Sequence, residues 1–108
     1  MCKTELFNEV LEIVSRETEI PANKIISHDR SAEVVDARYI LAYILYRRGI
    51  YISTIAEMMG YSRRAIEKII SQFDDRRNRL GGFFELIYKR SANKVRFANE
   101  STHLYSGA

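Results

Sequence analysis

A short stretch near the middle of the chain collects one hydroxyl and three basic side chains at helical spacing. They are Ser62, Arg63, Arg64 and Lys68. Ser62 belongs to the residue types that cap a helix N-terminus, and a helix beginning after it places the basic residues on its outer face. Guanidinium groups bind phosphate and can grip guanine through two hydrogen bonds. The spacing therefore favours a helix end that contacts nucleic acid, and the alternative is an ordinary solvated helix face.

The residues around this stretch have the spacing of two helices joined by a tight turn. Ala56 is small enough for two helices to cross closely, and Gly60 allows the positive φ that such a turn needs. Ile66 and Ile69 lie one turn apart on the inner face of the second helix. We therefore expect a helix-turn-helix over residues 52–72. Its predicted parts are a helix over 54–59 capped by Ser53 and a helix from Ser62 to about Arg79.

Apolar periodicity predicts helices in the rest of the chain as well. Phe7, Val10 and Val14 form one stripe of an amphipathic helix, and Pro21 ends that pattern while suiting the start of a new helical turn. The segment that follows Ser31, its expected cap, is apolar on more than one face and should be the central helix. The predicted helices cover residues 4–17, 21–26, 32–48 and 83–93, with a hairpin turning at 91–94 as the alternative for the last one. The expected fold is therefore an all-α, small multi-helix domain.

Length and composition are typical of one ordinary globular domain. The chain has 108 residues, of which 29% are charged and 46% are hydrophobic. We expect a single helical domain over residues 1–98 and a flexible C-terminal tail over 99–108, where periodicity is lost. There is no apolar run of about 18 residues and no basic segment followed by an apolar one at the N-terminus. We therefore expect a cytoplasmic protein with no membrane partner.

The residue types give no support to catalysis or to metal binding. Cys2 is the only cysteine, and His28 and His103 lie far apart. The sequence contains no glycine-rich phosphate loop and no histidine at a readable spacing from a nucleophile. We expect no enzymatic activity, no metal site, no cofactor and no small-molecule substrate.

Positive charge collects around and after the predicted helix-turn-helix. Residues 46–80 hold 8 basic and 4 acidic side chains, although the net charge of the whole chain is only +3. A DNA-binding surface requires such a concentration of charge, but exposed helices are often rich in Lys and Arg for solubility alone. Arg30 and Arg38 flank the start of the central helix, where either could reach a phosphate.

Several features follow one another in the order found in a family of DNA-binding domains. They are an apolar first helix, the segment Ile20–Ile26, a connection with Ser27 and Arg30, Val34 four residues before Arg38, and Ile55-Ala56 leading to Gly60. From about residue 10 to 70 the chain thereby resembles the C-terminal, origin-binding domain of the bacterial replication initiator DnaA, in the Trp-repressor-like group of helix-turn-helix domains. The turn is one residue shorter here and the family's Asp-His-Thr-Thr signature is missing. We therefore expect a divergent, stand-alone relative.

The resemblance implies that the chain binds double-stranded DNA. In that family a basic loop before the long helix contacts the backbone and the minor groove, while the helix after the turn reads the major groove. By resemblance, the loop candidates are Arg30 and Arg38, and the recognition-helix candidates are Ser62, Arg63, Arg64 and Lys68. The leading hypothesis is a sequence-specific regulator of replication or transcription.

Two further expectations concern protein partners. Glu33, Asp36 and Glu67 lie near the expected DNA face and repel phosphate, which favours a protein–protein interaction module built on a helix-turn-helix scaffold as the alternative function. Many helix-turn-helix proteins bind paired half-sites as dimers. A homodimer is therefore a further hypothesis, with the 83–97 segment as the first candidate for the contact.

Overall fold

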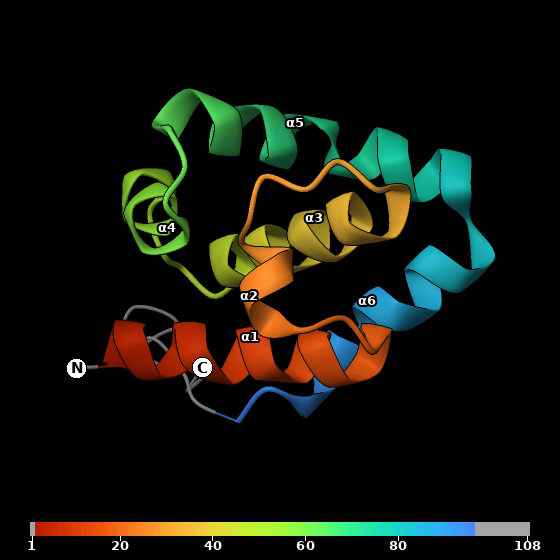
Figure 1. Ribbon diagram of the computed structural model, residues 1–108, viewed down its shortest axis with the longest axis horizontal. Coiled ribbons are helices and arrows are strands. Elements are labelled where there is room, and N and C mark those ends of the chain that lie inside the picture. Colours follow the sequence, from red (N-terminus) through yellow and green to blue (C-terminus); the bar gives the residue numbers. More distant parts are fainter. Residues whose placement is uncertain (1, 97–108) are drawn as a thin grey trace, which may run out of the picture.

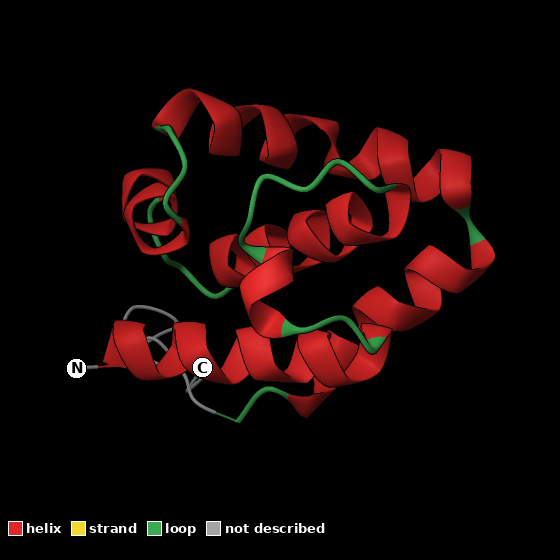
Figure 2. Ribbon diagram, in the orientation of Figure 1, coloured by secondary structure: helices red, strands yellow, loops and turns green. Residues whose placement is uncertain are grey.

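The computed structural model describes residues 2–96, and every regular element in that range is a helix, as Figure 2 shows. In chain order the helices are α1 (Cys2–Thr18), α2 (Ala22–Ile25), α3 (Ala32–Arg47), α4 (Ile52–Met59), α5 (Arg63–Leu80) and α6 (Gly82–Lys94). The predicted all-α class is confirmed, and the alternative hairpin at 91–94 is wrong because α6 runs through it. The predicted tail over 99–108 lies outside the described residues.

Helix α3 is the centre of the fold, as its apolar surface predicts. It lies between α1 and α5 in Figure 1, and it also contacts α2, α4 and α6. Ile40, Leu41 and Leu45 are fully or almost fully buried along it. Against this core, the ring of Tyr43 stacks on that of Phe73 from α5, with 3.8 Å between the ring centroids. Packing on several sides thus fixes α3 as the element against which α5 is positioned.

Helices α4 and α5 are joined by the three residues Gly60–Ser62. Gly60 has a φ of +74°, so the predicted left-handed conformation at this position is confirmed. Ala56, Ile66 and Ile69 are buried where the two helices pack together. The Ala65 amide donates to the Ser62 hydroxyl at 3.1 Å, which confirms the predicted cap of α5.

Two other predicted caps are wrong. Helix α4 begins at Ile52, before Ser53, because the carbonyl of Tyr51 already accepts from the amides of Thr54 and Ile55 at 3.0 Å. Ser31 occupies the N-cap position of α3, but its side chain makes no capping hydrogen bond. The Ser31 backbone contributes instead, because its carbonyl accepts from the Val35 amide at 2.9 Å.

Ion pairs tie α6 to both α5 and α1. Arg77 on α5 donates two hydrogen bonds to the Glu85 carboxylate, at 2.9 and 2.7 Å, across the Gly81 corner. Glu17 on α1 pairs with Arg90 at 2.9 Å and also with Lys94. These contacts fix the angle at which α6 leaves α5.

None of the helices in the described range is both long enough and apolar enough to cross a lipid bilayer.

Candidate nucleic-acid interface

The connection over residues 27–31, between α2 and α3, lies against the turn that precedes α5. The Tyr61 hydroxyl donates to the carbonyl of Ser27 at 2.5 Å, and its ring centroid is 4.7 Å from that of His28. These contacts join segments that are 34 residues apart in sequence. As a result, the 27–31 connection and the start of α5 form one continuous surface.

The buried Arg38 side chain supports this connection through hydrogen bonds to its backbone. Its Nε donates to the carbonyl of Ile25 at 2.9 Å, and its Nη2 donates to the carbonyls of Ser27 and Asp29 at 2.7 and 3.0 Å. The guanidinium also lies 5.4 Å from the centre of the Tyr61 ring, at cation–π distance. Only 6% of Arg38 is exposed. The structure therefore makes Arg38 a support for the connection and removes it from the residues that could contact a phosphate directly.

Arg30 remains at the surface of the same connection. It is exposed, and it has no ion-pair partner among residues 2–96. The carboxylate of the neighbouring Asp29 is held by other groups, since it accepts from the Ser31 amide at 2.7 Å and lies 3.9 Å from the Lys24 Nζ. Hydrogen bonding from Ser31 holds the pKa of Asp29 below its usual range, so this carboxylate stays charged near Arg30. Arg30 is thus free to bind an anion, beside one fixed negative charge.

The basic residues at the start of α5 all lie at the surface. Ser62, Arg63, Arg64 and Lys68 are exposed. Arg63 pairs with Glu67 one turn along the helix at 3.2 Å, whereas Arg64 and Lys68 have no ion-pair partner in the described part of the chain. Because the Arg63–Glu67 pair is solvent-exposed, it contributes only about 0–1 kcal/mol and yields readily to a stronger anion.

The second half of α5 is different, since two of its three arginines are used inside the fold. Arg76 donates to Asp36 on α3 at 2.8 Å and lies over the ring of Tyr39, and Arg77 is held by Glu85. Arg79, at the far end of the helix, is exposed. On the side of the Gly60–Ser62 turn, the cations available for a ligand are therefore Arg63, Arg64 and Lys68 on α5 and Arg30 on the 27–31 connection.

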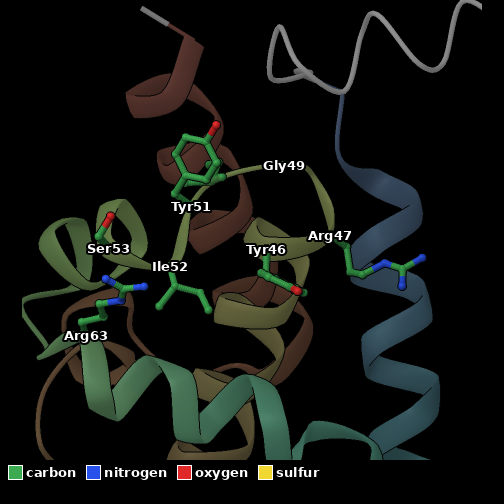
Figure 3. A pocket seen from close by; sticks show the side chains of 8 residues that line it. Tyr46, Arg47, Gly49, Tyr51, Ile52, Ser53 and Arg63 are labelled. Carbon is green, nitrogen blue, oxygen red and sulfur yellow. The ribbon is translucent and has the colours of Figure 1, made fainter.

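An open hollow extends this surface beyond the start of α5, where the end of α3, the start of α4 and Arg63 meet. Figure 3 shows the Arg63 guanidinium directed toward Ser53 and Ile52, with Tyr46 across the hollow and Arg47 pointing away. Tyr51 is 74% exposed at its edge. Sequence reasoning missed this hollow because three helix ends form it, and the local signal is limited to two Tyr and two Arg side chains within residues 46–51.

Within the described residues, no three His, Cys, Asp or Glu side chains converge to hold a metal ion. Comparisons with family models, curated proteins and solved structures gave no match to this chain.

Proposed function

We propose that α4, the Gly60–Ser62 turn and α5 form a helix-turn-helix that binds double-stranded DNA in a sequence-specific way. The start of α5 would enter the major groove, and Arg30 would contact the backbone or minor groove beside it. The observation that carries this proposal is the hydrogen bond from Tyr61 to Ser27, which brings the turn before α5 against the connection that holds Arg30.

Side-chain roles follow from the partners that each residue already has. Arg64 and Lys68 are unpaired in the described structure and are the first candidates for base or phosphate contacts. Arg63 would exchange the Glu67 carboxylate for the nucleic acid. The Ser62 hydroxyl accepts from the Ala65 amide, so its own proton is available to a phosphate oxygen. Arg38 would act indirectly, by holding the 27–31 connection in shape.

The charge on the far side of the fold supports the same orientation. Helix α1 lies opposite α5 in Figure 1 and exposes Glu5 and Glu12 on its outer surface, with Glu9 partly exposed between them. These carboxylates oppose phosphate more than the start of α5 does, even though Arg16 pairs with Glu12, and this difference would orient the protein during encounter with DNA. We propose a role in the control of replication or transcription, without enzymatic activity.

Selection from a pool of random DNA duplexes at fixed salt tests the proposal most directly. We expect an enriched sequence motif with the wild-type chain and no enrichment with the Arg63→Ala/Arg64→Ala variant. The matched control is Lys3→Ala/Arg16→Ala, which removes the same charge from exposed positions on α1. Arg16 is a close counterpart of Arg63, since it pairs with Glu12 one turn away at 3.1 Å.

The salt dependence of DNA affinity distinguishes the loss of direct phosphate contacts from the effect of a lower net charge. Each phosphate contact that is lost should lower the slope of log affinity against log salt by about 0.9. If the control variant loses affinity and slope as much as the α5 variant does, the start of α5 has no special role. A wild-type chain that enriches no motif overturns sequence-specific binding.

The second candidate function is a protein–protein interaction module built on the same scaffold. It is favoured by three exposed apolar side chains, Leu80, Phe83 and Leu86, at the corner between α5 and α6. Failure of the duplex selection, together with unchanged folding, would promote this function over the first.

A further inference from the structure

A patch of exposed apolar side chains lies at the far end of α5 from the proposed DNA surface. The exposed fractions are 42% for Leu80, 74% for Phe83 and 49% for Leu86. We call these three residues the corner patch. The bidentate bond between Arg77 and Glu85 spans the corner and holds α5 and α6 at a fixed angle. The patch is therefore presented on a rigid support.

An apolar hollow of about 380 Å³ opens directly beside the corner patch, and Leu80 and Phe83 form part of its wall. The rest of its apolar lining comes from the segment after α1, from α3 and from α6, with Ile20, Ala37, Ile40, Phe84 and Ile87. A projecting aromatic ring and a hollow that accepts apolar groups thus lie next to each other on one face. In a contact about a two-fold axis, the ring of each copy would meet the same face of the other copy, where the hollow lies.

Charges at the edge of this face fit the same symmetry. Glu33 on α3 lines the hollow, while Arg79 precedes Leu80 on α5, and neither has an ion-pair partner in the described range. The other carboxylate at the hollow, Asp36, is already neutralised by Arg76 at 2.8 Å. Under a two-fold axis, Glu33 of each copy can face Arg79 of the other. Each copy therefore supplies one unpaired carboxylate and one unpaired guanidinium, which are the groups needed for two equivalent ion pairs.

We propose that a second copy of this chain covers the corner patch in a symmetric dimer, with Phe83 of each copy in the hollow of the other. The contact includes the first turns of α6, within the 83–97 segment considered from the sequence. The patch of three side chains is small compared with the roughly 1,200 Å² that stable interfaces bury, so we expect a weak dimer whose population rises with protein concentration.

Dimerisation through the corner leaves the start of α5 open, although Glu33 at the corner lies only three residues after Arg30. Helix α5 has 18 residues, which at about 1.5 Å per residue separates its two ends by about 27 Å. In Figure 1 its start lies beside α4 and its end joins α6 at the opposite edge of the molecule. Self-association and DNA binding can therefore be tested separately.

Analytical ultracentrifugation over a wide range of protein concentration measures the dimer directly. Phe83→Glu places a charge in the apolar contact and should weaken dimerisation at least about tenfold, the loss expected for a central aromatic side chain. Tyr51→Glu is the matched control, because Tyr51 and Phe83 are both 74% exposed and Tyr51 lies away from the corner. Circular dichroism should show the same helix content in both variants.

Charge reversal tests the orientation of the two copies. Glu33→Arg and Arg79→Glu should each weaken the dimer, and the double variant should recover most of the affinity. The proposal is overturned if the wild-type chain stays monomeric at every concentration, if Phe83→Glu dimerises as well as Tyr51→Glu, or if the double reversal is no tighter than the single ones. A monomeric Phe83→Glu variant should still select the same DNA motif, which keeps this test separate from that of the proposed function.

Discussion

Replacing Arg38 with methionine should destabilise the fold, because this arginine supports the 27–31 connection. Methionine retains an apolar stem in the same space but removes three hydrogen bonds to the carbonyls of Ile25, Ser27 and Asp29. The Ile25 contact is buried, and leaving its carbonyl unpaired costs about 1–3 kcal/mol. The other two contacts are partly exposed, so water can replace them at about 0.5–1 kcal/mol each.

The expected total for Arg38→Met is therefore about 2–5 kcal/mol, a large part of the roughly 5–15 kcal/mol that stabilises a typical domain. Urea unfolding followed by circular dichroism measures this difference. The control is Arg30→Met, a neighbouring and exposed arginine whose loss should change stability by less than about 0.5 kcal/mol.

Amide hydrogen exchange locates the effect of the Arg38 substitution. Residues 25–31 should lose protection in Arg38→Met while the core of α3 keeps it, because the guanidinium stabilises the connection and not the helix interior. If Arg38→Met and Arg30→Met have equal stability, the three carbonyl contacts do not hold the connection and our reasoning about Arg38 is wrong.

Two other predictions concern Tyr61 and Glu17. Tyr61→Phe removes the hydroxyl that donates to Ser27 and should cost only about 0.5–1.5 kcal/mol of stability, because Arg38 still donates to the same carbonyl. Tyr61→Phe should also weaken DNA binding, and the loss of affinity should be larger in the wild-type chain than in a chain that already carries Arg30→Ala. Equal losses in this double-mutant cycle would show that Tyr61 does not position Arg30. Hydrogen bonding from Lys94, with the charge of Arg90, holds the pKa of Glu17 below its usual 4.5. The stabilising contribution of Glu17 is thus fully present above pH 4.5 and is lost as the pH falls through the lower pKa of the folded state. Urea midpoints measured across this range should fall less steeply in Glu17→Gln than in the wild type, whereas parallel curves would contradict the assignment.

Local sequence signals predicted the helices well, because each depends on residues close together in the chain. The apolar stripe of α1, the all-round apolar surface of α3 and the inner residues of α5 all have a period set by the helix itself. Gly60 was equally predictable, since few residues other than glycine adopt a φ of +74° without strain. The caps were less predictable. Ser31 and Ser53 are of a residue type that caps helices. Whether a serine hydroxyl accepts a capping hydrogen bond depends on the backbone conformation at the helix start.

In the candidate site, too, features that depend on neighbouring residues were predictable from the sequence, and features that depend on packing were not. Exposure of Arg63, Arg64 and Lys68 follows from their positions on α5 opposite the buried Ile66 and Ile69. For the 27–31 connection the sequence placed Arg30 and Arg38 together, whereas the structure separates them into an exposed cation and a buried support.

The sequence by itself therefore determined which segments are helical, which face of each is apolar, and where the chain turns before α5. Tertiary structure alone decided that Arg38 is buried, that Tyr61 bonds to Ser27, and that the corner patch stands beside a hollow. The physical reason is distance along the chain. Helical periodicity acts over three or four residues, but these features bring together groups that are far apart in the chain, such as Tyr61 and Ser27 at a separation of 34 residues. Only the packing of α1, α3, α5 and α6 sets which of these groups meet.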